Sequence, residues 1–332
     1  MSLKSDSSTA KPSSVPLAGL KRGTANDTSG PVGRFAPSPS GPLHFGSLIT
    51  ALASFLDVRT QQGQWLLRID DLDAPRTTPG SEATILQTLE AHQLHWDGTP
   101  TRQSDHQPHY ELALQELARL DLLFFCDCSR KSLKGATAYP GNCRHRRCNP
   151  AQLAAHLRTP PDAHDCAIRL QMPDRELGFN DQLQGPQKTH LAREGGDYIV
   201  LRRDGLVSYQ LAVVVDDALT AVTQVVRGAD LLPTTARQQH LHEQLGCTAP
   251  TWLHLPILLN QRNTKLSKQA RSLAVTAANV AANLCIALQL LGQQPPPEAT
   301  LWPAHELMDW AIANWSRDRL PAGESFADFY GW

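Results

Sequence analysis

Short apolar runs alternate with amphipathic segments along the first third of the chain. Residues 32–37 and 65–69 have the length and apolar character of buried strands. Between them, apolar residues recur at helical spacing and predict a helix that begins near Gly46. The same spacing predicts helices over residues 79–92 and 105–119, the second leading into an apolar run at 122–125. Strands that alternate with helices in this way indicate an α/β fold with a parallel sheet and right-handed crossovers.

This pattern stops between residues 126 and 195, where turn residues replace it, and we interpret that stretch as an insertion. The apolar run from Leu211 to Val215 is expected to resume the sheet. Three further helices are predicted, over residues 234–245, 277–291 and 303–314. The predicted organisation is an extension (1–31), two halves of a catalytic domain (32–125 and 196–250), the insertion (126–195), and a loop with C-terminal helices (251–332).

Composition and charge exclude several classes of protein. With 41% hydrophobic and 19% charged residues, the chain resembles soluble globular proteins rather than disordered or fibrous ones. No stretch approaches the roughly 20 apolar residues of a membrane-spanning helix, and the net charge of −1 gives no overall sign of nucleic-acid or membrane binding. The first thirty residues lack the apolar core of a secretion signal, and Asp6 and Asp27 argue against a transit peptide.

Seven cysteines without a secretion signal indicate a reducing compartment, the cytoplasm, rather than a disulfide framework. Cys126-x-Cys128 followed by Cys143 suits a structural tetrahedral zinc site, although four free thiols in a loop would have the same spacing. The spacing leaves the fourth ligand open, and Cys148 and His145 are the chemically preferable candidates. Six basic residues surround the cysteines, a plausible RNA footprint or simply a solvated surface: Arg130, Lys131, Lys134, Arg144, Arg146 and Arg147.

Two motifs predict nucleotide chemistry. In Arg34-Phe-Ala-Pro-Ser-Pro-Ser-Gly-Pro-Leu-His44-Phe-Gly46-Ser47, a strand ends, the chain turns, and a helix begins. The helix N-terminus would offer backbone N–H groups to a phosphate, with His44 as a further donor. In Lys265-Leu-Ser-Lys268-Gln, two cations three residues apart suit a mobile clamp for a triphosphate. Each motif alone is also typical of an ordinary surface loop.

Together, and in this order, the two motifs resemble the HIGH and KMSKS signatures of the class I aminoacyl-tRNA synthetases. The phrase beginning at Arg34 resembles the opening of the glutamyl group, and the resemblance covers roughly residues 32–270. It implies a Rossmann-type catalytic domain with a zinc-bearing insertion. After Gln269 only 63 residues remain, fewer than the roughly 100 that a further domain needs, so a short helical part and no anticodon-binding domain are expected. This combination resembles the short paralogues, the glutamyl-Q tRNA(Asp) synthetases.

The resemblance implies a role for each matched position. Two guanidinium groups would hold the two carboxylates of glutamate, and Asp70, where the family usually has Glu, would hold its ammonium group. The implied glutamate site comprises Arg34, Phe35, Ala36, Pro37, Ser38, Asp70, Tyr209 and Arg227. The implied ATP site comprises His44, Gly46, Ser47 and Lys268, with His44, Lys265 and Lys268 as catalytic residues. The family pattern Cys-x-Cys…Tyr-x-x-x-Cys selects Tyr139 as the fourth zinc ligand, beside Cys126, Cys128 and Cys143.

The implied activity has two steps. ATP, with Mg²⁺ on its phosphates, would activate L-glutamate as an adenylate without tRNA, and glutamate would then pass to queuosine in the anticodon loop of tRNA(Asp). No membrane and no obligate protein partner is implied. Three alternatives stay open: a compact glutamyl-tRNA synthetase that charges the 3′ end of tRNA(Glu), a small-molecule nucleotidyltransferase, and a non-enzymatic RNA- or zinc-binding protein.

Overall fold

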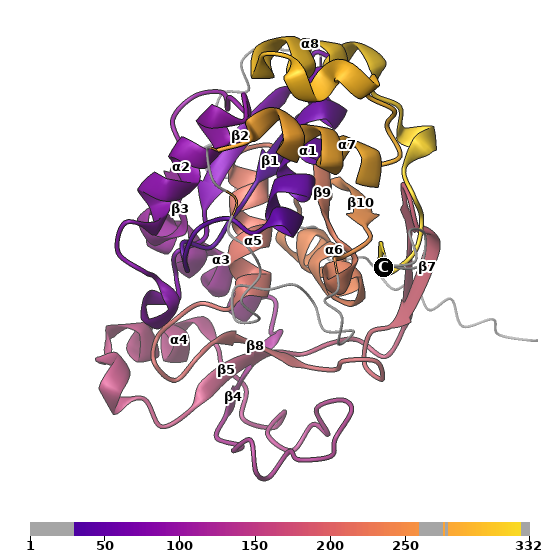
Figure 1. Cartoon of the computed structure of the whole chain (residues 1–332). Helices are drawn as coiled ribbons and strands as arrows, with labels where there is room; N and C mark the ends of the chain where they lie inside the picture. The colour runs from indigo at the N-terminus through magenta and orange to yellow at the C-terminus, as the bar shows by residue number, and fades with distance from the viewer. Residues whose placement is uncertain (1–29, 259–274, 276–277, 327–332) are drawn as a thin grey trace, which may run out of the picture.

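A five-stranded parallel sheet forms the centre of the protein (Figure 1). The computed structural model describes residues 30–258, 275 and 278–326. The strands follow the order β10-β9-β1-β2-β3, and every neighbouring pair is parallel. Their bounds are Val32–Phe35 (β1), Gln64–Ile69 (β2), Thr101–Arg102 (β3), Gln224–Gly228 (β9) and Thr251–Leu255 (β10). The predicted α/β fold with a parallel sheet is therefore confirmed.

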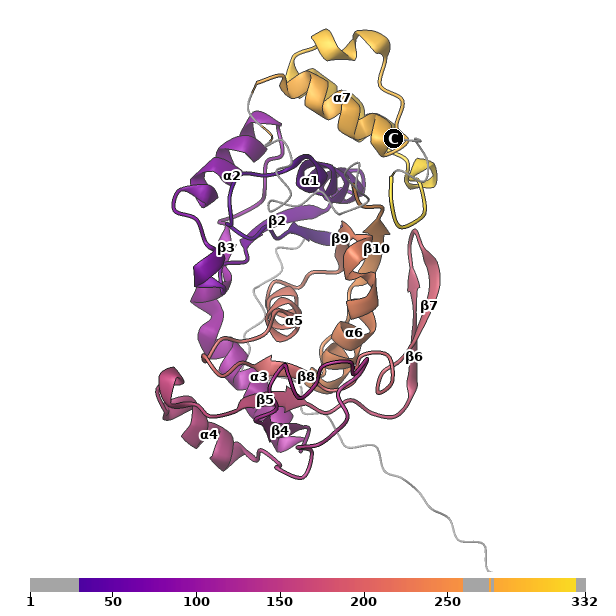
Figure 2. The same ribbon diagram turned by 60° about the horizontal axis from the view of Figure 1, so that its bottom comes forward.

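Helices cover both faces of this sheet (Figure 2). On one face lies α1 (Phe45–Arg59), against which α7 (Val280–Leu290) and α8 (Ala304–Asn314) pack. Helix α2 (Ser81–Ala91) lies on the same side. Leu52 and Trp65 are fully buried between these elements and belong to the first hydrophobic core. Among the described helices, none is long and apolar enough to cross a membrane.

The opposite face carries α5 (Tyr209–Leu219) and α6 (Thr235–Leu245), which pack against each other and against α3 (Gln107–Arg119). The prediction that residues 211–215 form a strand is wrong, because they lie in α5. Every residue from 211 to 217 is buried. An apolar run that is buried on all sides loses the 3.6-residue periodicity and cannot be told from a buried strand.

The segment between β3 and β9 contains two smaller antiparallel sheets. In one, β4 (Leu123–Cys126) pairs with β5 (Ala167–Leu170), which pairs with β8 (Tyr198–Leu201). The apolar run at 122–125 thus contributes to this sheet and not to the parallel one. Helix α4 (Pro150–Arg158) lies beside it.

The other sheet is a hairpin of β6 (Glu176–Asp181) and β7 (Gly185–His190). It runs along the edge strand β10, and Gln182 N donates to Trp252 O at 2.8 Å. The hairpin therefore brings a part of the predicted insertion next to the parallel sheet.

Candidate active site

A cavity of about 660 Å³ opens at the carboxyl ends of β1, β9 and β10. Strand order reverses between β1 and β9, and in open α/β sheets ligands bind at such a switch point. The cavity wall brings together ten of the residues predicted from the sequence: Arg34, Phe35, Ala36, Pro37, Ser38, His44, Gly46, Ser47, Tyr209 and Arg227. Lys265 and Lys268 lie outside the described residues, and their roles stay predictions.

His44 caps the N-terminus of α1 at this cavity. Its Nδ1 accepts a hydrogen bond from Ser47 N at 3.1 Å, and its Nε2 lies 3.0 Å from Ser47 Oγ. An accepting Nδ1 places the proton of a neutral ring on Nε2, which makes that nitrogen a donor. A Cβ on Gly46 would come within 3.2 Å of His44 Nδ1, so this turn leaves little space for a larger residue.

Arg34, at the carboxyl end of β1, is buried and paired with a carboxylate. Its Nε and Nη2 donate to Asp217 at 3.3 and 3.4 Å, and Asp217 also accepts from Arg68 Nη1 at 2.7 Å. Burial alone would raise the pKa of Asp217, but the two guanidinium groups lower it to about 2. Asp217 therefore stays ionised and offsets part of the charge of Arg34.

Asp70 is not among the residues of the cavity wall. Its carboxylate accepts from Arg68 Nε at 2.7 Å, and burial raises its pKa to about 6. Asp is one methylene shorter than the Glu expected at this position, and in this structure the shorter side chain is held by Arg68. Its proposed contact with the substrate ammonium group stays a prediction.

No role was predicted from the sequence for Asp216 or Asp217. Asp216 is fully buried and accepts from Gln103, His106 and Tyr110 at 2.7 to 2.8 Å. The available signal was two consecutive acids inside an apolar run, because buried carboxylates require partners.

Arg227, at the carboxyl end of β9, has a different environment from Arg34. It is buried and donates to three neutral acceptors: His254 Nε2 at 2.9 Å, Gln238 Oε1 at 2.8 Å and Thr235 Oγ1 at 2.8 Å. Among the described residues, no carboxylate forms an ion pair with it. Burial lowers the pKa of Arg227. The cavity thus combines one partly neutralised and one fully charged guanidinium, which suits an anionic ligand.

Replacing Asp217 by asparagine should reduce both glutamate affinity and stability. The two guanidinium groups would lose their shared carboxylate, so we expect the KM for glutamate to rise roughly 10-fold and the free energy of unfolding to fall by about 3 kcal/mol. The pKa of Asp217 falls from 3.8 to about 2 on folding, so its contribution is complete above pH 4 and is lost toward pH 2. Urea unfolding of the unmodified protein and of Asp217→Asn, above pH 4 and near pH 2, measures this pH-dependent loss of stability. The control is Asp97→Asn, at the distant ion pair with Arg59. Equal loss in both variants would contradict the assignment.

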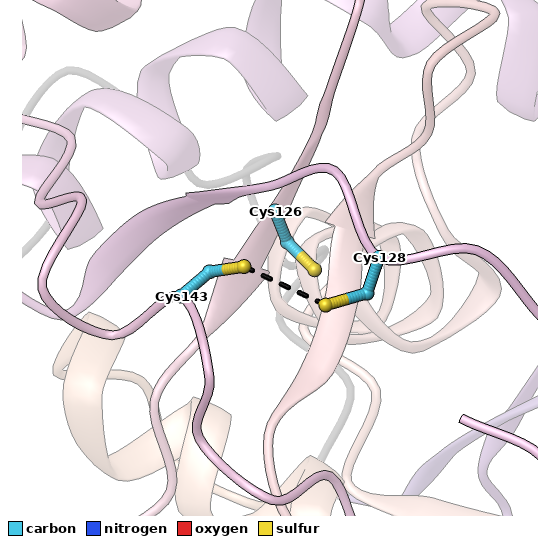
Figure 3. Close-up of side chains that lie close together, drawn as sticks. All are labelled: Cys126, Cys128 and Cys143. Carbon is cyan, nitrogen blue, oxygen red and sulfur yellow. Dashed lines mark hydrogen bonds between the residues drawn. The ribbon is translucent and has the colours of Figure 1, made fainter. Parts of the chain in front are cut away.

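The sulfur atoms of Cys126, Cys128 and Cys143 lie within 4.8 Å of one another (Figure 3). Tetrahedral zinc would place neighbouring sulfurs about 3.8 Å apart, and sulfur and oxygen about 3.6 Å apart. Cys128 Sγ lies 3.6 Å from Cys143 Sγ, and the Tyr139 hydroxyl lies 3.5 Å from Cys126 Sγ and 3.7 Å from Cys128 Sγ. These four side chains could therefore hold a metal ion.

Cys148, the alternative ligand, lies elsewhere. It is fully buried in the second hydrophobic core and does not belong to the group of Cys126, Cys128 and Cys143. Burial raises the pKa of its thiol to about 12. His145 is not in that group either. In contrast, Arg169 Nε donates to Cys126 Sγ at 3.2 Å. Burial alone would raise the pKa of the Cys126 thiol, but the hydrogen bonds with Tyr139 and Arg169 lower it. The geometry favours Tyr139 over both alternatives.

The basic cluster around the cysteines is weaker than the sequence indicates. Three of its six cations form ion pairs, each at 2.7 Å: Arg144 with Asp197, Arg146 with Asp127, and Arg147 with Asp121. These acids lie outside residues 129–148, a stretch that carries all six cations and itself contains no acid. Arg130, Lys131 and Lys134 are exposed and form no ion pair with any described residue.

Comparisons with known proteins agree with this geometry. Residues 32–293 match the family described as tRNA synthetases class I (E and Q), catalytic domain. A glutamyl-Q tRNA(Asp) synthetase of Pseudomonas aeruginosa (strain PAO1) is 48% identical over 295 residues, 89% of this chain and 96% of the relative. A protein of the same name from Aromatoleum aromaticum is 46% identical over 87% of this chain and 90% of the relative.

A solved structure resembles the fold as well. It is a glutamate tRNA ligase from Elizabethkingia meningosepticum in complex with its amino acid, with a TM-score of 0.70 and 25% sequence identity. The match covers 89% of this chain and 66% of the solved chain, so this chain spans about two thirds of that enzyme's length.

Proposed function

The chain belongs to the glutamyl-Q tRNA(Asp) synthetases, within the class I tRNA synthetases for glutamate and glutamine, and on this premise we propose how its cavity works. It activates L-glutamate with ATP in the absence of tRNA. It then transfers glutamate to queuosine in the anticodon loop of tRNA(Asp), the tRNA that appears in the names of its relatives.

The observation that carries this proposal is the convergence of Arg34, Arg227 and His44 on one cavity. Glutamate carries two carboxylates, and two guanidinium groups can bind both of them with charge-assisted hydrogen bonds. The N-terminus of α1, with its backbone N–H groups and His44, suits a phosphate beside them. A cavity with both features can bring a carboxylate and a nucleotide phosphate together.

In the first step, the ionised α-carboxylate attacks the α-phosphorus of ATP in line. A carbon–oxygen–phosphorus anhydride bond forms, and the bond to pyrophosphate breaks. No general base is needed, because the carboxylate is already deprotonated at neutral pH. Positioning in the cavity and donation from His44 Nε2 and the α1 N-terminus lower the barrier. Mg²⁺ bound to ATP neutralises phosphate charge, and Lys265 and Lys268 are the proposed partners of the triphosphate.

In the second step, a hydroxyl of the queuosine cyclopentenediol attacks the activated carbonyl carbon. An ester forms, AMP leaves, and the hydroxyl proton is released. The product differs from that of a conventional synthetase, in which the acceptor is the ribose at the tRNA 3′ end.

Pyrophosphate exchange without tRNA tests the first step. The purified protein should exchange labelled pyrophosphate into ATP when glutamate is present. Aspartate should support much less exchange, because its shorter side chain cannot reach both guanidinium groups at once. Exchange that requires tRNA, or that occurs without any amino acid, would contradict the proposal.

We also propose that Cys126, Cys128, Cys143 and Tyr139 hold a structural Zn²⁺ ion. Four protein ligands leave no open position, so the metal would stabilise the fold and take no part in adenylation. Cys126 is the last residue of β4 and Cys128 follows that strand, so the site would tie the end of β4 to the loop that carries Tyr139 and Cys143.

Removal of zinc should lower the melting temperature by about 5 °C, because the metal stabilises the folded state alone. Calorimetry with and without a chelator measures this shift. Cys143→Ser should show no further shift on chelation. Cys285→Ser, at a buried cysteine of the first core, should respond like the unmodified protein. A chelator shift that persists in Cys143→Ser would exclude this site.

A further inference from the structure

His254, on β10, lies directly behind Arg227 and is fully buried. Its Nδ1 lies 2.5 Å from Asp181 Oδ2, and its Nε2 lies 2.9 Å from Arg227 Nε. A guanidinium Nε–H can only donate, so His254 Nε2 must accept. The single ring proton therefore lies on Nδ1, where it is donated to Asp181, and the imidazole is neutral.

Asp181, at the end of β6, is held in one orientation. Its Oδ1 accepts from three backbone N–H groups, those of Leu183, Gln184 and His254, at 3.1, 2.8 and 3.2 Å. This leaves Oδ2 for the His254 ring. Burial would raise the pKa of Asp181, but these hydrogen bonds lower it, and burial lowers the pKa of His254. The two lowered pKa values favour an ionised Asp181 carboxylate beside a neutral His254 ring.

These contacts orient the guanidinium of Arg227 without neutralising its positive charge. His254, Thr235 and Gln238 fix the guanidinium from three sides, and none of them carries a negative charge in this arrangement. Arg34 is fixed by the carboxylate of Asp217 instead. A buried guanidinium that is held by neutral acceptors retains its charge for a ligand carboxylate.

We propose that Asp181 and His254 form a positioning pair that orients Arg227 for a substrate carboxylate. The pair makes the β6–β7 hairpin, a part of the predicted insertion, a determinant of glutamate affinity. This inference rests on the proposed function, in which Arg227 binds glutamate. Neither residue was singled out in the sequence, because they are 73 positions apart and only the fold brings them together.

Pyrophosphate-exchange kinetics of two His254 variants test the proposal. His254→Leu removes the acceptor of Arg227 Nε, so the KM for glutamate should rise between about 10-fold and 100-fold, with the KM for ATP changed less than about 3-fold. His254→Gln should restore most of the affinity, because its Oε1 can accept from Arg227. His92→Leu, at a fully buried histidine beside α7, is the matched control and should leave both constants unchanged.

Asp181→Asn tests the tautomer argument independently. The three backbone N–H groups at Oδ1 would keep the amide oxygen on their side, so the amide NH₂ would face His254 Nδ1. The ring must then accept at Nδ1 and carry its proton on Nε2. Two N–H groups would face each other there, so Arg227 Nε would lose its acceptor. We expect a rise in the KM for glutamate similar to that of His254→Leu. The ring ¹⁵N signals of His254 can be assigned by their absence from the spectrum of His254→Gln. In Asp181→Asn, these signals should change from the pattern of an Nδ1–H ring to that of an Nε2–H ring.

The outcomes separate this inference from the proposed function. If the unmodified protein shows no glutamate-dependent exchange, the proposed function fails. If it is active but His254→Leu and Asp181→Asn keep the KM for glutamate, the positioning pair is refuted. Equal increases in the KM for glutamate and for ATP, without rescue in His254→Gln, would show a merely structural role and refute it too. If His254→Leu does not fold, the other two variants decide.

Discussion

Replacing Arg227 by glutamine should raise the KM for glutamate by about 100-fold or more in pyrophosphate exchange. Glutamine retains hydrogen-bonding capacity but removes the charge. Arg227 is surrounded by neutral acceptors, so its charge is available to a ligand carboxylate, and glutamine would not replace that charge. The KM for ATP should change little, since the α1 N-terminus and His44 are untouched.

The matched control is Arg59→Gln, at the C-terminal end of α1, where the guanidinium pairs with Asp97. It should lose some stability and keep both Michaelis constants. A normal KM for glutamate in Arg227→Gln would show that this side chain does not bind the substrate. The assignment would also fail if ATP and glutamate were affected equally.

Transfer of labelled glutamate should depend entirely on queuosine. We expect labelled tRNA(Asp) only when the tRNA comes from cells that make queuosine, and no product above background with tRNA that lacks it. The reason is chemical, because the proposed acceptor hydroxyls belong to the modified base and have no counterpart in guanine. Acid-precipitable radioactivity measures the product.

Removal of the 3′-terminal adenosine of the tRNA before the transfer reaction distinguishes the competing activity. A conventional glutamyl-tRNA synthetase would lose its acceptor ribose, so its product would disappear. The queuosine ester should still form, because its hydroxyls lie in the anticodon loop. Periodate cannot replace this treatment, because it cleaves the free vicinal diols of both the ribose and queuosine and spares either one once it is esterified. Labelling of queuosine-free tRNA(Glu) would exclude the proposed acceptor directly.

The sequence predicted the architecture well where periodicity is strong. The strands at β1 and β2 and the helices α2, α3, α6, α7 and α8 occur within a few residues of their predicted places. Periodicity failed at α5, because residues 211–215 are all apolar and, like the two acids that follow them, are buried. It also could not show that β4 joins a separate antiparallel sheet, since strand pairing depends on partners distant in sequence.

The candidate site was predicted in part. The motif at 34–47 could be placed beside Arg227 by resemblance, and the cavity contains both. What holds these side chains could not be predicted. Asp217 and His254 come from other elements, and their contacts depend on side-chain geometry that no local pattern encodes. The basic cluster was overestimated for the same reason, because the acids that pair with Arg144 and Arg147 lie outside its window.

A crystal structure with a non-hydrolysable glutamyl-adenylate analogue tests the central claim most directly. We predict one carboxylate on Arg227, the phosphate mimic at the N-terminus of α1 beside His44, and the whole analogue within the cavity formed by β1, β9 and β10. An analogue bound elsewhere, or one that leaves Arg227 without a carboxylate partner, would contradict the account.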